Sequence, residues 1–159
     1  CWMGASGISD KIYLLSPSVW EKEACEHNPN DLNKMKKLFI HELVHSYHAQ
    51  YNPNKNMEGF SEMSWFVEGL AVFVSGQFED DEKQRVKDLN SNNELPVQLS
   101  QFWKGKNRYV VSGSIMNYLF DKYGVETIFE CLKFQSTTKI LNYLDTTEEK
   151  LILEWKKSI

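Results

Sequence analysis

One short stretch constrains this chain more tightly than any other: residues 41–45, which read His-Glu-Leu-Val-His. On a helix, residues four apart share one face, with their Cβ atoms about 5–6 Å apart. Two imidazoles at that spacing can share one tetrahedral zinc ion, each at about 2.0–2.1 Å. Glu42 is turned about 100° around the helix from His41, so it can reach a water beside the metal without being a ligand. We therefore expect His41 and His45 to be metal ligands on one helix.

The pattern alone leaves an alternative open, because it fixes only three of five positions and chance matches occur. A surface helix with two solvated histidines would fit it as well. Residues 65–73, Trp-Phe-Val-Glu-Gly-Leu-Ala-Val-Phe, favour the metal, since Glu68 is the only charge in an apolar segment. A buried carboxylate needs a cation or a metal as partner. Glu68 is therefore either half of a structural salt bridge or the third ligand of a site that leaves its fourth position to water.

The two segments together resemble the gluzincin metallopeptidases. H-E-x-x-H over residues 41–45 is followed by W-x-x-E-G-x-A over residues 65–71, as in the small peptidase MA-like domains and, more distantly, the aminopeptidase N and thermolysin types. Residues 109–124 and 151–155 are similar to later helices of those domains, so the likeness spans most of residues 8–157.

The resemblance implies an α+β fold, mostly helical and zincin-like, with a small N-terminal sheet. It also implies one zinc per chain, with His41, His45 and Glu68 as ligands and Glu42 as general base. The expected activity is hydrolysis of a peptide or protein substrate. Tyr109, which opens the helix after the third ligand, is expected to donate a hydrogen bond to the oxyanion, although it could instead simply pack at the helix start.

The resemblance has one departure and one further expectation. Thermolysin-like members carry an aspartate four residues after the ligand glutamate, and here that position is Val72, so support for the histidines must come from elsewhere. The strand near residues 12–15 is expected to border the cleft and to pair with an extended substrate.

The metzincin pattern is not met, because His48 and Tyr51 stand where its glycine and third histidine belong. We expect His48 to be a cleft-wall or surface residue.

A different class of function is a catalytically inactive, zincin-like binding module of a larger protein. The intact histidine and glutamate pattern argues against it. The net charge of −4, from 18 basic and 22 acidic residues without a basic run, makes nucleic acid an unexpected partner. No apolar run approaches the roughly 20 residues of a membrane span, and no signal peptide is visible. The compartment and the oligomeric state therefore stay open.

Length predicts a single domain over residues 1–159, either a processed form or a domain excised from a longer protein. Its three cysteines, Cys1, Cys25 and Cys131, are an odd number without C-x-x-C spacing. They predict neither a disulfide framework nor a cysteine zinc site.

Local patterns predict the elements. We expect one strand over residues 8–16 after a turn at residues 4–7, a short helix over 19–26, and a helix capped by Asn28 that ends near Tyr51. The next helix, capped by Ser61 or Ser64, is expected to end near Gly76. Further helices are predicted over residues 79–89, 107–123, 125–134, 139–144 and 148–157. The apolar residues expected to form a buried stripe on the zinc helix are Phe39, Ile40, Leu43, Val44, Tyr47 and Tyr51.

Overall fold

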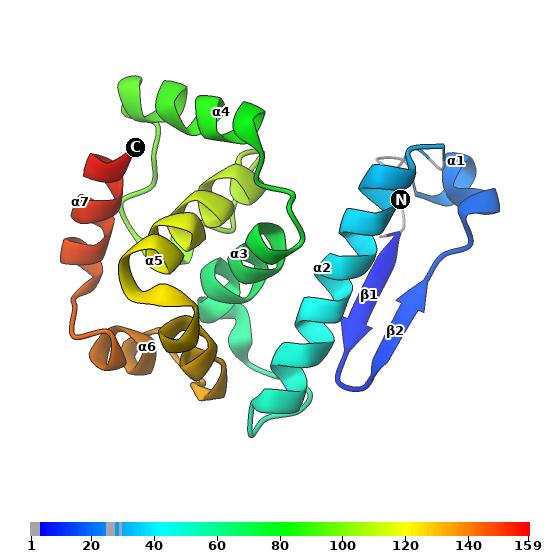
Figure 1. The fold of residues 1–159 in the computed structure, drawn as a ribbon, viewed down its shortest axis with the longest axis horizontal. Helices are drawn as coiled ribbons and strands as arrows, with labels where there is room; N and C mark the ends of the chain where they lie inside the picture. The colour runs from blue at the N-terminus through cyan, green and yellow to red at the C-terminus, as the bar shows by residue number, and fades with distance from the viewer. Residues whose placement is uncertain (1–3, 25–27, 29) are drawn as a thin grey trace.

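The computed structural model describes residues 4–24, 28 and 30–159. In this part of the chain the fold is mostly helical, with a small two-stranded antiparallel sheet near the N-terminus, as an α+β class requires (Figure 1). The strands are β1 (Ala5–Ile8) and β2 (Lys11–Leu14), and the helices are α1 (Trp20–Glu23), α2 (Leu32–Tyr51), α3 (Ser64–Val74), α4 (Asp80–Ser91), α5 (Arg108–Glu130), α6 (Thr137–Tyr143) and α7 (Glu148–Ser158). Four short 3-10 turns accompany them: η1 (Pro17–Val19), η2 (Phe60–Met63), η3 (Leu99–Gln101) and η4 (Cys131–Lys133).

Helix α2 lies between the β-hairpin on one side and the bundle of later helices on the other (Figure 1). Helix α3 packs between α2 and α5, at the centre of the hydrophobic core. Its expected burial is confirmed, because Trp65, Phe66, Leu70 and Ala71 are almost inaccessible to solvent. This places the apolar segment that carries Glu68 directly against the H-E-x-x-H helix.

The predicted single strand is wrong, because residues 5–14 form a hairpin. Its register pairs Ala5 with Leu14 and Ile8 with Lys11. The chain reverses at Ser9, which has a positive φ of 54°, and short polar residues tolerate that conformation. Residues 5–7, expected in a turn, are therefore part of β1, the strand that packs against α2.

The N-cap of α2 is a different residue from the predicted Asn28. Asp31 is the N-cap, and its carboxylate accepts a hydrogen bond from the Lys34 N–H at 3.0 Å. Asn28 accepts instead from the Asn30 N–H, which makes a local turn before the helix. Pro29, Cys1, Cys25 and the end of the short helix predicted over 19–26 lie outside the described residues. The C-terminal end of α2 at Tyr51 agrees with the prediction.

The predicted buried stripe of α2 is also wrong. Phe39, Leu43, Tyr47 and Tyr51 are exposed by 41–59%, and Ile40 and Val44 are only partly buried. The buried residues of this helix are mainly polar: His41, Glu42, Ser46, His48 and Ala49. Polar side chains can occupy this inner face because α3, β1 and η4 supply partners for them.

Glycines end two helices where expected. Gly76 has a φ of +74° just after α3, and Gly124 has a φ of +79° where the long element α5 is broken into two helical parts. The second part of α5 ends at Glu130, earlier than predicted, and continues into η4. The predicted serine caps of α3 are not formed, since Met63 is the N-cap and Ser64 donates its hydroxyl to the Ser61 carbonyl.

The remaining helices, α4, α6 and α7, lie close to their predicted ranges. The helices of the described residues are all too short or too polar to cross a lipid bilayer. Cys131 is a buried free thiol, and burial raises its pKa to about 12.

Candidate metal centre

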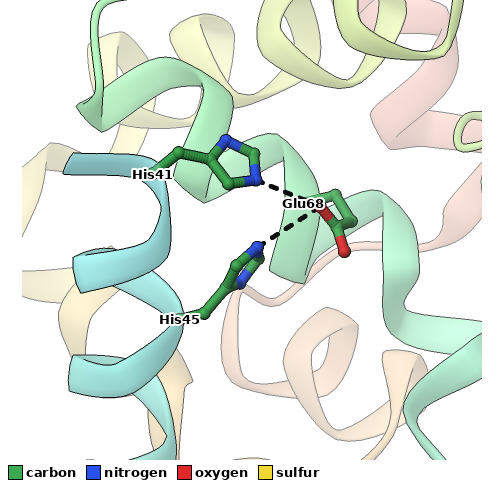
Figure 2. Close-up of side chains that lie close together, drawn as sticks. All are labelled: His41, His45 and Glu68. Carbon is green, nitrogen blue, oxygen red and sulfur yellow. Dashed lines mark ion pairs between the residues drawn. The ribbon is translucent and has the colours of Figure 1, made fainter. Parts of the chain in front are cut away.

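Three side chains from two helices meet at the inner face of α2 (Figure 2). His41 and His45 come from successive turns of α2, and Glu68 comes from the middle of α3. Both histidine Nε2 atoms lie 3.4 Å from the same oxygen, Oε2 of Glu68. The structure therefore brings together the three residues that the sequence predicts as ligands.

These separations suit a shared metal ion better than direct hydrogen bonds. An N–H···O hydrogen bond usually spans about 2.7–3.2 Å, which is shorter than both distances found here. Two atoms bound tetrahedrally to zinc at about 2.0–2.1 Å lie about 3.3–3.4 Å from each other. The donors are also the two-histidine, one-glutamate set of catalytic zinc sites, so the residues present fit that ion.

The three groups interact strongly with one another. Burial alone would raise the pKa of Glu68, but the two imidazoles outweigh it and lower the pKa to about 2. Burial works against the charged form of His45, yet Glu68, with a smaller contribution from Glu42, raises its pKa above the ordinary value. The negative charge of Glu68 therefore favours positive charge at this cluster. The Glu68 side chain is 27% exposed, so the cluster is open to solvent on one side.

Glu42 is buried beside this cluster and is fixed by the hairpin. Its Oε2 accepts a hydrogen bond of 2.6 Å from the backbone N–H of Gly7 in β1. A side chain at Gly7 would collide with the Glu42 carbonyl, so only glycine permits this close approach. A second bond, from the Ser46 hydroxyl to the Ser9 carbonyl at 2.6 Å, joins α2 to the hairpin turn.

His41 has a second partner, Gln77, in the connector between α3 and α4. Its Nδ1 lies 2.8 Å from Oε1 of Gln77. Because a carbonyl oxygen only accepts, His41 carries its proton on Nδ1, and Nε2 is left with a lone pair for a metal. Val72, at the aspartate position of the resembled family, faces α5 instead, where it packs at Gly113.

The strand beside the site is β1, which corrects the expectation for residues 12–15. Strand β2 contains these residues up to Leu14 and lies on the far side of β1 from α2 (Figure 1). The side chains of Tyr13 and Leu14 are more than half exposed. Because the chain forms a hairpin here, the strand next to α2 is β1, which comes first in the sequence. Strand β2, which contains residues 12–14, is the outer strand of the pair.

Tyr109, the predicted oxyanion donor, contacts Trp103 and Arg108. Its ring packs edge-on against Trp103 at 4.8 Å, and the Arg108 guanidinium lies 5.0 Å from its centre. It is 42% exposed. Its role at the oxyanion therefore stays a prediction.

His48 is fully buried, so the expectation of a cleft-wall or surface residue is wrong. Its Nε2 lies 3.1 Å from the Leu132 carbonyl in η4. Asn52, also fully buried, donates to the carbonyls of Leu132 and Phe134. Both side chains thus anchor the end of α2 to the C-terminal half of the molecule.

Sequence reasoning missed two residues of the site, Gly7 and Gln77. The signal for Gly7 was a glycine inside a segment that follows a strand pattern, which often marks a close backbone approach. The signal for Gln77 was weaker: a polar residue just after the helix-ending Gly76. Their partners lie 35 and 36 residues away along the chain, so only the fold shows the contacts.

No family model, no curated protein and no solved structure matches this chain. The function is therefore argued from the chemistry of the site itself.

Proposed function

We propose that this chain is a zinc-dependent peptidase with a zincin-like fold. His41, His45 and Glu68 would hold one zinc ion per chain, and Glu42 would be the general base. The observation that carries the proposal is the pair of 3.4 Å separations between both histidine Nε2 atoms and one glutamate oxygen. They match two ligand pairs of a tetrahedral zinc, next to a buried carboxylate.

Bound zinc would supply a Lewis acid and a water whose pKa falls to about 7. The chain must supply the proton acceptor, and this role would fall to Glu42, which is buried and directly follows His41 in the sequence. Its Oε2 is engaged by the Gly7 N–H, so Oε1 is the oxygen that would take the proton from the attacking water. The same carboxyl can then give the proton to the leaving amine.

An extended peptide substrate would pair with the edge of β1 that does not face β2. The Gly7 N–H points away from β2, toward Glu42. Because backbone groups alternate along an antiparallel strand, the N–H and C=O of Ala5 point to the same edge. A peptide pairing with this edge would lie alongside the general base.

The proposal is tested with the purified chain, a broad mixture of peptides and a zinc chelator. Wild type should bind one zinc per chain and cleave peptides, and chelation should abolish cleavage until zinc is restored. Glu42→Gln should keep the zinc and lose cleavage, because the amide cannot take the proton. Glu68→Ala should bind zinc more than about 100-fold more weakly, beyond the usual cost of losing a residue that only supports a ligand.

Two results would contradict the proposal. Equal zinc content in wild type and Glu68→Ala would exclude the assigned ligands. Zinc binding without cleavage of any peptide in the mixture would instead favour an inactive binding module.

A further inference from the structure

We infer that Gln77 is a positioning residue for the metal, acting through His41. This inference rests on the proposed zinc site and extends it to a residue outside the ligand set. The contact between His41 Nδ1 and Gln77 Oε1 spans 2.8 Å, a good hydrogen-bond distance. It fixes the imidazole proton on Nδ1 and the ring plane in one orientation, so that Nε2 faces Glu68.

The connector holds Gln77 in place through the backbone. Gly76 adopts a left-handed conformation with φ +74° directly after α3. The Gly76 N–H bonds to the Phe73 carbonyl, and the Gln77 N–H bonds to the Val72 carbonyl at 3.0 Å. This helix ending turns the chain back toward α2, which brings the Gln77 side chain to His41.

The two residues after Gln77 fix the other end of the connector. Phe78 is partly buried and lies against Gly113 of α5. Glu79 forms an ion pair of 2.6 Å with Lys37, whose side chain is only 15% exposed. Lys37 lies one helical turn before His41 on α2. Gln77 is therefore anchored on both sides, and its side chain is held against one turn of the zinc helix.

The neutral amide has a specific chemical consequence. A carboxylate at this place would draw the Nδ1 proton more strongly and make Nε2 a stronger donor to the metal. Gln77 supplies the orientation without the negative charge. Position 72 has no carboxylate to take this place, because it is a valine, and its side chain packs at Gly113 in the core.

The test measures zinc affinity by competition with a chromogenic chelator, and the visible spectrum of the cobalt-substituted protein. Gln77→Met keeps the length of the side chain but removes the acceptor, so it should weaken zinc binding 10- to 100-fold and change the cobalt spectrum. Gln77→Glu keeps an acceptor and should bind zinc at least as tightly as wild type. The matched control is Gln84→Met on the exposed side of α4, which should change neither measurement.

The outcomes separate this inference from the proposed function. If wild type binds zinc and Gln77→Met binds it equally tightly, the positioning role fails and the zinc site stands. If Gln77→Met and Gln77→Glu weaken binding equally, the residue has only a structural role and the inference is overturned. A wild-type protein that binds no zinc overturns both.

Discussion

At the scale of single residues, His48 is a buried imidazole in which only one ring nitrogen has a hydrogen-bond partner among the described residues. Its Nε2 donates to the Leu132 carbonyl, and Nδ1 has no partner among the described residues. The rings of Phe60 and Phe66 lie edge-on at about 6 Å. Burial, together with positive charge on His45, outweighs the opposing effect of the Leu132 bond and lowers the pKa of His48 to about 4.

This low pKa predicts a loss of stability in mild acid. Between pH 6.5 and about 4 the unfolded chain protonates His48, whereas the folded chain does not. Stability therefore falls with falling pH in this window, by about 3 kcal/mol over its full width. His48→Gln, whose amide can still donate to Leu132, should remove this part of the pH dependence. Urea unfolding of zinc-free protein at pH 6.5, 5.5 and 4.5 measures it.

In this pH window His48 can be distinguished from His45 and Glu68, the two other groups with shifted pKa values near it. The pKa of His45 is raised, so its contribution is complete below pH 6.5 and is lost only as the pH rises. Glu68, with a pKa of about 2 against the ordinary 4.5, loses its contribution below pH 4.5. An equal pH dependence in wild type and His48→Gln would show that His48 is not the group that titrates.

A second residue-scale prediction concerns the proposed reaction. If Tyr109 donates to the oxyanion, Tyr109→Phe should lower kcat and kcat/KM together, by about 100-fold or more, since such a donor acts only in the transition state. Zinc content and thermal stability should be unchanged, because the phenyl ring keeps the contact with Trp103. Turnover at the wild-type rate would assign the oxyanion to another donor.

At the scale of elements, the crossing of α3 and α5 depends on glycine. A Cβ at Gly69 would lie 2.6 Å from the backbone oxygen of Ser112, so the two helices would have to move apart. Gly69→Ala should therefore destabilise the fold by about 1–3 kcal/mol, reduced by the better helix propensity of alanine. Gly113→Ala is the matched comparison, because a Cβ there meets side-chain atoms of Val72 and Phe78, which can shift.

Chemical unfolding of wild type and both variants measures this difference. The loss in free energy of unfolding should be larger for Gly69→Ala than for Gly113→Ala, since a backbone oxygen in a helix cannot rotate away. Because Gly69 follows Glu68 directly, zinc affinity should also fall in the first variant more than in the second. The reverse order would contradict the close approach of Gly69 to the Ser112 backbone as the reason for the destabilisation.

Element by element, local patterns predicted most of the helices and the three side chains of the candidate site, but not the inner face of α2. The ligand pattern is local, since His41 and His45 lie four residues apart, and α3 is so apolar that its burial followed directly. The inner face of α2 could not be predicted from periodicity, which assumes that apolar side chains are the buried ones. Here Leu43 and Tyr47 are exposed, while polar side chains are buried because distant segments provide their partners.

At the scale of the whole molecule, α2 connects the N-terminal hairpin to the helical bundle. On the hairpin side the contacts are made by Gly7 and Ser9, and on the bundle side His48 and Asn52 bond to carbonyls near η4. Between these lies the cluster of His41, His45 and Glu68, in which one carboxylate faces two imidazoles. A metal there would join α2 to α3 at the middle of the molecule, where the helices already pack together.

This arrangement predicts that zinc stabilises the entire fold. A ligand that binds the folded chain alone adds about 2.7 kcal/mol when its free concentration is 100 times Kd. For a chain of 159 residues that corresponds to a rise in Tm of about 5–10 °C. The rise should grow with zinc concentration, reverse on chelation and be absent in Glu68→Ala. Differential scanning calorimetry of both proteins with and without zinc measures it, and an equal rise in the two would place the stabilising metal at a different site.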